Sequence, residues 1–333
     1  MSSQQMRENA PDQLASVLDA GGEALRGRIE RTEARLAEIA TGHGELLADY
    51  AGDTLAAGGK RLRPTLVFIC AGDPADEDDA ALIQAGAAVE LLHMATLVHD
   101  DVLDRAALRR GRATVFARGG APAATATGDL LFSRAFAELT RTGSAEAVRV
   151  LSWASSALAR GELMQREDAW SDDVTPDRYL ERCELKTARL FEAACRLGAI
   201  LGRPGPDAAA ALGAFGSRIG VAFQIFDDVL DVSGPVARTG KPRGTDLLDG
   251  TVTLPLILAR RRDPSLRHLD VSTAAEAEAA CDRIAATGAL DEARDAALEH
   301  VAAAKQVLDG LDLSERQVRT LELVADGVVE RYA

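Results

Sequence analysis

The sequence predicts an all-α protein, with a single domain of about ten or more helices. Apolar residues recur at three- and four-residue spacing in segment after segment, and runs with strand-like alternation are hard to find. Aromatic residues make up only 4% of the chain, whereas alanine and other strong helix formers are abundant. Glycine and proline cluster between these runs, where they end one helix before the next begins.

Capping residues mark several of the expected helix boundaries. Asp76 to Asp79 supply acidic side chains where a helix should begin, at the positive end of its dipole. Thr175 is an N-cap followed by Pro176 at the first helical position, and the helix they open should run to Gly202. The other breaks show no composition typical of an interdomain linker, so one domain is expected.

The overall composition limits the classes of function. The net charge of −14 argues against a nucleic-acid partner, because phosphate binding needs a basic face. Residues 1–14 are polar and lack the apolar core of a signal peptide, so we expect a disordered tail there and one domain over residues 15–333. No uncharged apolar run of about 18 residues occurs, so no membrane span is expected. Four cysteines without CxxC spacing indicate buried core residues of a reduced, cytoplasmic protein: Cys70, Cys183, Cys195 and Cys281.

The sequence DDVLD occurs twice, at Asp100–Asp104 and at Asp227–Asp231. In each copy the first and last aspartates lie one helical turn apart on the same face, where like charges repel. Apolar flanks should draw both segments into the interior, where an uncompensated carboxylate costs on the order of several kcal/mol or takes up a proton. Each copy, which we call an acidic claw, therefore needs a cation.

Two kinds of cation can compensate the claws. Pairing with arginine is the simpler interpretation, and it suffices for one acidic pair on a surface helix. Two matched triads in apolar helices fit magnesium better, because this ion binds one or two carboxylates and completes its shell with water and phosphate oxygens. The candidate metal ligands are Asp100, Asp101, Asp104, Asp227, Asp228 and Asp231.

Two basic clusters favour a diphosphate substrate. GGKRLRP contains Lys60, Arg61 and Arg63 after a double glycine, and Arg109 and Arg110 follow the first claw. Arginine binds phosphate oxygens in bidentate fashion, and lysine binds them as a point charge. Each cluster alone is also explained as a solvated loop or as positive charge at a helix C-terminus. A lone histidine in an apolar helix is usually a core residue. His93 becomes a candidate because it lies two turns before the first claw, on the acidic face.

At these residues the sequence closely resembles the trans-type polyprenyl diphosphate synthases. The matching stretches run in the family's order from residue 58 to about 258: GGKRLRPTLV, ELLHMATLVHDDVLDRAALRRG, GDLLFSRAF, KTARLFEAACRLGA, FQIFDDVLDV, and GKPRGTDLLDG followed by TVTLPL. The combination is very specific, whereas a lone DDxxD is not. The resemblance implies an all-α bundle of helices around a central cavity, usually as a homodimer.

The resemblance also implies the reaction. An allylic diphosphate ionises, isopentenyl diphosphate attacks the resulting cation head-to-tail, and a proton is lost. Asp100 and Asp104 would bind Mg²⁺ on the allylic diphosphate with Asp101 assisting, and Asp227 would hold a further ion with Asp228 and Asp231 nearby, about three ions per site. Isopentenyl diphosphate would be held by Lys60, Arg63, His93 and Arg110. The allylic side would be lined by Arg109 and by the catalytic candidates Lys186, Thr187, Gln224 and Lys241.

Two departures from the family bear on this assignment. The family often has lysine in two stretches after the second claw where this chain has Thr245 and Thr251, so Lys241 is the main candidate cation there. Short-chain members carry a bulky aromatic residue four or five positions before the first aspartate, whereas this chain has Thr96 and Ala95. The growing product would then pass on toward Leu92. We expect a medium- or long-chain product of about 30 carbons or more.

Several alternatives remain open. Small residues in an alanine-rich helix are also explained by packing, and another helix or a partner subunit would then close the tunnel of a short-chain farnesyl or geranylgeranyl diphosphate synthase. A class I terpene cyclase would share the fold and the first claw, but its second metal motif typically mixes Asn, Ser and Glu. A non-catalytic subunit of a heteromeric synthase tends to have lost one claw. An acidic scaffold protein does not explain the order of the motifs.

Overall fold

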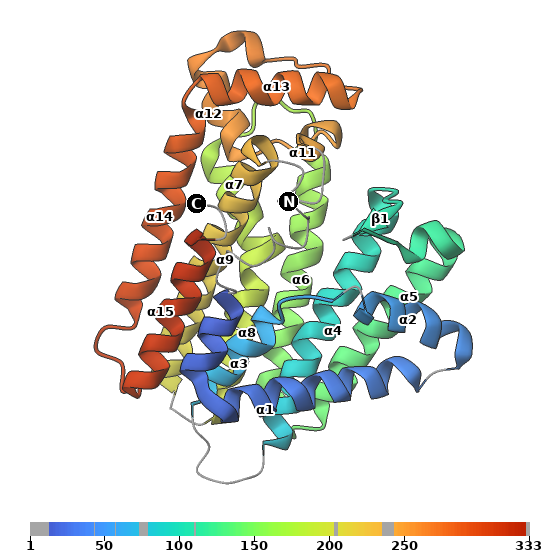
Figure 1. The fold of residues 1–333 in the computed structure, drawn as a ribbon, viewed down its shortest axis with the longest axis vertical. Helices are drawn as coiled ribbons and strands as arrows, with labels where there is room; N and C mark the ends of the chain where they lie inside the picture. Colours follow the sequence, from blue (N-terminus) through green and yellow to red (C-terminus); the bar gives the residue numbers. More distant parts are fainter. Residues whose placement is uncertain are drawn as a thin grey trace, which may run out of the picture.

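The computed structural model describes residues 13–42, 44–56, 58–72, 79–109, 111–202, 206–234 and 243–330. Long helices lie side by side in it, α1 crosses one end of them, and shorter helices cover the other end (Figure 1). The helices are α1 (Gln13–Thr41), α2 (Glu45–Ala56), α3 (Leu62–Ala71), α4 (Ala80–Leu103), α5 (Val115–Thr140), α6 (Ala145–Glu167), α7 (Pro176–Cys183), the π-helix η1 (Glu184–Ala188), α8 (Arg189–Gly202), α9 (Pro206–Ser233), α11 (Thr245–Leu248), α12 (Leu254–Arg262), the 3-10 helix η2 (Pro264–Leu266), α13 (Ala274–Ala286), α14 (Ala289–Val307) and α15 (Glu315–Glu330). The prediction of an all-α fold is confirmed.

A short hairpin follows the first claw. Its strands, β1 (Leu108–Arg109) and β2 (Arg112–Ala113), pair antiparallel and are the only strands among the residues that the structure describes. Gly111 turns the chain with a φ of 77°, which a residue without a Cβ adopts at no steric cost. Arg110, between the strands, lies outside the described residues.

The two claws lie on the most apolar long helices. α4 packs against α3, α5 and α8, whereas α9 packs against α8 and α14. Both are long and apolar enough to cross a membrane, but 72% and 56% of their apolar windows are buried inside the protein, and core helices show the same property. Both helices run toward the end of the bundle where β1, α11 and α13 lie (Figure 1). The claws, at their C-terminal ends, therefore lie at that same end.

The expected boundaries are found where the chain is described. Thr175 caps α7 by accepting a hydrogen bond from the backbone N–H of Arg178 at 3.2 Å, and Pro176 occupies the first helical position. The chain stays helical from there to Gly202, but it widens into the π-helix η1 on the way. α4 begins directly after Asp79, whereas Asp76 to Asp78 lie outside the described residues, as do residues 1–12 of the expected tail. All four cysteines are free and buried, as predicted.

Candidate active site

Arginine pairing accounts for two carboxylates of the first claw. Asp101, in the last turn of α4, is only 4% exposed and accepts a hydrogen bond from Nε of Arg109 at 2.8 Å. Asp104, the residue that follows α4, accepts a hydrogen bond from Nη2 of Arg166 on α6 at 2.6 Å. The simpler interpretation of the claw is thus correct in part, and Arg109 is held against Asp101.

Asp100 has a different environment. Among the described residues, no side chain forms a hydrogen bond or ion pair with its carboxylate. Burial raises the pKa of Asp100 to about 6; the charge of Lys186 opposes this shift, and the charges of Glu162 and Asp104 add to it. The negative end of the α4 dipole adds to the need for a cation. Asp100 is therefore the member of this claw best suited to bind a metal ion.

Three side chains of α6 connect the first claw to Lys186. Arg166 bridges Asp104 and Glu162, with an Nε to Oε1 distance of 2.8 Å to the glutamate. Glu162 Oε2 lies 2.5 Å from Nζ of Lys186, which also donates to Gln165 at 3.2 Å. The sequence analysis missed Glu162, Gln165 and Arg166. Their i, i+3, i+4 spacing in GELMQRE, on one helix face, was the available signal.

Lys186 and Thr187 both belong to the π-helix η1. Single π turns inside α-helices are rare and occur frequently at functional sites. Neighbouring helices approach this turn from two sides through glycines. A Cβ on Gly161 of α6 would lie 2.6 Å from the backbone nitrogen of Lys186, and a Cβ on Gly220 of α9 would lie 2.5 Å from Cα of Ala188. Backbone packing therefore determines where this turn lies.

In the second claw, each oxygen of Asp228 accepts a hydrogen bond from a neutral donor. It is 4% exposed, and it accepts hydrogen bonds from the Tyr179 hydroxyl at 2.7 Å and from Nε2 of Gln224 at 2.8 Å. The Thr187 hydroxyl in turn donates to Oε1 of Gln224 at 2.7 Å. Burial raises the pKa of Asp228 to about 8, helped by the charge of Asp246 and opposed by the two hydrogen bonds. The sequence analysis missed Tyr179.

The other two aspartates of this claw differ in exposure and contacts. Asp227 is exposed. Asp231 accepts hydrogen bonds from the backbone N–H groups of Thr245 and Asp246, both at 3.2 Å, and so anchors the start of α11. Burial and the charge of Asp246 raise the pKa of Asp231 to about 8. Asp246 is thus a further carboxylate beside the second claw that the sequence analysis did not identify.

The predicted cations for isopentenyl diphosphate come from α3, α4 and the loop before α3. Lys60 is exposed, and His93 is half-buried on α4. Arg63 lies over the ring of Phe191, 4.5 Å from the centre of the ring. Phe191 is on α8, one helical turn after Thr187. Arg61 instead pairs with Glu90 at 2.7 Å and with Glu33, which explains why it is buried. Two further predicted residues, Arg110 and Lys241, lie outside the described residues.

The predicted chain-length residues belong to α4 and lie one to two helical turns before the first claw. Leu92 and Ala95 are completely buried, whereas Thr96 is half-buried and donates to the backbone carbonyl of His93 at 2.8 Å. The assignment of these residues to product length stays a prediction.

The donor set fits magnesium, although no metal cage is preassembled. In the described part of the chain, no group of three or more His, Cys, Asp or Glu side chains is arranged to hold an ion alone. The raised pKa values of Asp100, Asp228 and Asp231 indicate carboxylates in need of positive charge. Magnesium takes few protein carboxylates and completes its shell with phosphate oxygens, so a partial protein shell suits it.

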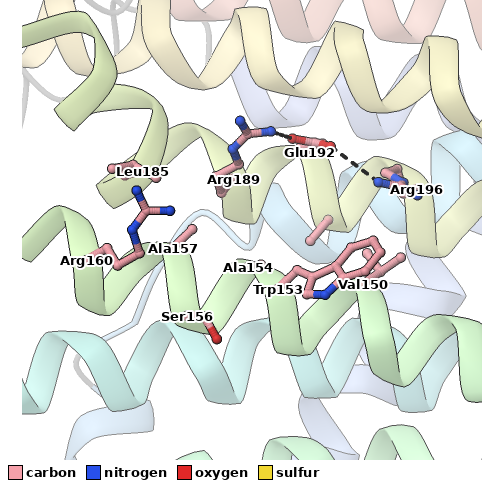
Figure 2. A pocket seen from close by; sticks show the side chains of 11 residues that line it. Val150, Trp153, Ala154, Ser156, Ala157, Arg160, Leu185, Arg189, Glu192 and Arg196 are labelled. Atoms are coloured by element: carbon pink, nitrogen blue, oxygen red, sulfur yellow. Dashed lines mark hydrogen bonds and ion pairs between the residues drawn. The ribbon is translucent and has the colours of Figure 1, made fainter. Parts of the chain in front are cut away.

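A pocket of about 370 Å³ lies between α6 and α8 (Figure 2). Its apolar wall includes Trp153, and a row of charges on α8 has Glu192 between Arg189 and Arg196 (Figure 2). Arg160 of α6 also lines it. None of the predicted site residues lines this pocket, so it is not the site described above.

Comparisons with known proteins decide the family. The family model for polyprenyl synthetase matches residues 45–287. The chain belongs to the polyprenyl synthetase family. Geranylgeranyl diphosphate synthase of Methanosarcina mazei is 37% identical over 284 residues, covering 83% of this chain and 86% of the relative.

Solved structures of the polyprenyl synthetase family agree closely with this fold. Heptaprenyl diphosphate synthase from Staphylococcus aureus matches with a TM-score of 0.87 at 30% identity, over 93% of this chain and 99% of that one. Polyprenyl synthase from Caulobacter crescentus, complexed with calcium and isoprenyl diphosphate, matches with a TM-score of 0.87 at 33% identity, over 97% and 98% of the two chains. These relatives are named for different product lengths. The present protein is therefore a prenyltransferase whose product length they leave open.

Proposed function

We propose that this prenyltransferase condenses isopentenyl diphosphate head-to-tail with an allylic diphosphate, in a reaction that depends on Mg²⁺. One arrangement supports this most strongly: both claws connect to the same π-helical turn. Asp100 experiences the charge of Lys186, and the neighbouring Thr187 leads through Gln224 to Asp228. A single diphosphate beside this turn would therefore be within the influence of both claws.

Different residues of the two claws and of η1 would bind the metal ions and the diphosphate. Asp100 and the exposed Asp227 are the main metal ligands in this proposal, and Asp104 would turn from Arg166 to the ion. Asp101 and Asp228 accept hydrogen bonds from Arg109 and Tyr179 and would lie beside the ions. Bound Mg²⁺ would supply the positive charge that stabilises the departing diphosphate. Lys186, held by Glu162 and Gln165, adds a fixed cation beside that diphosphate.

The second substrate would lie toward α3. Lys60, Arg63 and His93 hold isopentenyl diphosphate in this proposal, and the contact of Arg63 with Phe191 brings it one turn from Thr187. Apolar helix walls exclude water, which would otherwise quench the carbocation. We assign no described side chain beside Thr187 as the base, and we propose the departing diphosphate as the proton acceptor.

We propose a product of about 30 carbons or more. The small side chains of Ala95 and Thr96 support an open path past the first claw, and the partly accessible Thr96 is the position where a larger side chain would project. A product of about 20 carbons would favour the short-chain alternative and would require a tunnel floor from another helix.

We propose that two copies pair across α6. Trp153, Ser156, Arg160 and Leu163 recur at the spacing of one helix face, and Trp153 and Leu163 are 65% and 66% exposed. Exposed apolar side chains that gather on one face mark interaction sites more often than single scattered ones do. The pocket in Figure 2 borders this face and offers a recess for a partner's side chains. In light scattering we expect Trp153→Asp to be monomeric, whereas Leu298→Asp, at an exposed leucine of α14, stays dimeric; two dimeric variants would contradict this interface.

The function is tested by incubating the protein with Mg²⁺, labelled isopentenyl diphosphate and one allylic starter at a time, and then sizing the dephosphorylated products. We expect elongation of farnesyl or geranylgeranyl diphosphate. No condensation with any starter would contradict the proposed reaction and favour a non-catalytic subunit.

The free, buried cysteines support a cytoplasmic location.

A further inference from the structure

A chain of hydrogen bonds runs from a completely buried tyrosine to the π-helix. The Tyr179 hydroxyl donates to Oδ2 of Asp228 at 2.7 Å. The other oxygen, Oδ1, accepts from Nε2 of Gln224 at 2.8 Å, and Oε1 of Gln224 accepts from the Thr187 hydroxyl at 2.7 Å. The four residues come from α7, α9 and η1, so no single helix creates the chain.

The direction of the hydrogen bonds follows from the chemistry of the groups. Both oxygens of Asp228 accept hydrogen bonds in the structure, and this fixes the orientation of Gln224: its NH₂ group points to Asp228 and its carbonyl oxygen to Thr187. A hydroxyl has a single hydrogen, and that of Thr187 is used by Gln224. Thr187 can therefore offer a ligand only its oxygen lone pairs. Lone pairs stabilise a carbocation, whereas a hydroxyl hydrogen repels it.

We propose that Tyr179 is a positioning residue for prenyl transfer, which keeps the oxygen of Thr187 and not its hydrogen available to the reacting cation. The inference rests on the proposed function, because it assumes that a cation forms beside Thr187. Tyr179 acts through Asp228 and Gln224, both of which it helps to orient.

The loss of the tyrosine hydroxyl would release this arrangement. In Tyr179→Phe, one oxygen of the buried Asp228 lacks its donor, which is costly in the interior. The carboxylate can then rotate, and the amide of Gln224 is no longer held in one orientation. A turned amide presents N–H to Thr187, whose hydroxyl must then accept from it and point its hydrogen elsewhere.

The test compares steady-state kinetics of the full-length protein and its variants. We expect Tyr179→Phe to lower kcat about tenfold or more, with the KM for isopentenyl diphosphate unchanged. Cys183→Ala is the matched control, because this buried thiol neighbours the Tyr179 hydroxyl but gives no hydrogen bond to Asp228; it should keep the wild-type kcat. In a Thr187→Val background, Tyr179→Phe should have no further effect on kcat, because the hydroxyl through which it acts is gone.

Equal losses from Tyr179→Phe in both backgrounds, or a kcat within about twofold of the wild type, would overturn the inference. If Tyr179→Phe does not fold, Thr187→Ser and Thr187→Val decide instead: the serine variant should keep most of the activity and the valine variant should lose it, and equal activities would contradict the relay. An inactive wild-type protein would refute the proposed function itself. An active wild type with an unaffected Tyr179→Phe would refute the relay alone.

Discussion

Gly161 of α6 lies against the main chain of Lys186, at the point where the helix widens into a π turn. A Cβ at Gly161 would come within 2.6 Å of the backbone nitrogen of Lys186, closer than side-chain carbons approach backbone atoms. The neighbouring Glu162 holds the Lys186 ammonium at 2.5 Å. Helix packing and the charge beside the first claw are therefore set by adjacent residues of α6.

We expect Gly161→Ala to displace the π turn and lower kcat by about tenfold or more, since small misplacements of catalytic groups are costly. Overpacking should also lower the free energy of unfolding by about 1–3 kcal/mol. Gly27→Ala, in a helical position of α1 with open space around the new Cβ, is the control and should be neutral or stabilising. Wild-type kinetics and stability of Gly161→Ala would show that this contact is not close in solution.

The two neighbouring aspartates of the first claw should behave differently. Asp100→Asn removes a carboxylate without a protein partner among the described residues, so kcat should fall by about 10²–10³-fold while the melting temperature holds or rises. Asp101→Asn breaks the buried pair with Arg109 and should lower the free energy of unfolding by about 1–3 kcal/mol. Thermal melts and steady-state assays of both variants measure the contrast. A larger loss of kcat in Asp101→Asn than in Asp100→Asn, together with a lower melting temperature of Asp100→Asn, would contradict these roles.

The second claw should make stability and metal binding depend on pH. Asp228 and Asp231 have pKa values of about 8 in the metal-free protein, well above the ordinary value of about 3.9. The folded chain then holds protons that the unfolded chain has released. The stability from these groups is fully present below about pH 4 and is lost as the pH rises through about 8.

A Mg²⁺ ion bound at Asp227 would lower the pKa of the neighbouring Asp228 and Asp231 by its charge, so its binding at pH 7 should release protons and its affinity should rise with pH up to about 8. Calorimetry in buffers of different ionisation enthalpy measures this release, with inorganic diphosphate present to complete the metal site. The variant Asp228→Asn, which removes one of the two carboxyl protons, should release fewer. Proton uptake on binding, or an affinity for Mg²⁺ that does not change between pH 6 and 9, would contradict the raised pKa values of Asp228 and Asp231.

Product length should respond to the half-buried position before the first claw. Thr96→Phe would place an aromatic ring one turn before Asp100, where it should stop elongation and shorten the main product. Chromatography of the dephosphorylated products measures the shift, and Thr96→Val, which keeps the size of the side chain, should retain the wild-type distribution. Unchanged products from Thr96→Phe would mean that the chain grows along another path.

Local sequence was sufficient to predict the helices and the claws, because periodicity and capping act within a few residues. Thr175, Pro176 and the start of α4 lie where the sequence predicted. The side chains with which the claw carboxylates pair were harder to predict, because tertiary packing decides which side chains meet. The pairing of Asp104 with Arg166 and of Asp228 with Tyr179 joins residues from separate helices. The π turn at Lys186 has no local signature, since ELKTA is ordinary helical sequence and the glycines that border the turn come from α6 and α9.

The central claim is that the claws act together on an allylic diphosphate whose ionisation is coupled to condensation. The most direct measurement follows diphosphate release from farnesyl diphosphate and incorporation of labelled isopentenyl diphosphate in the same reaction with Mg²⁺. We predict one diphosphate released for each isoprene unit incorporated, and negligible release without isopentenyl diphosphate. Diphosphate release without isopentenyl diphosphate, accompanied by a cyclic hydrocarbon, would contradict the account and identify a terpene cyclase.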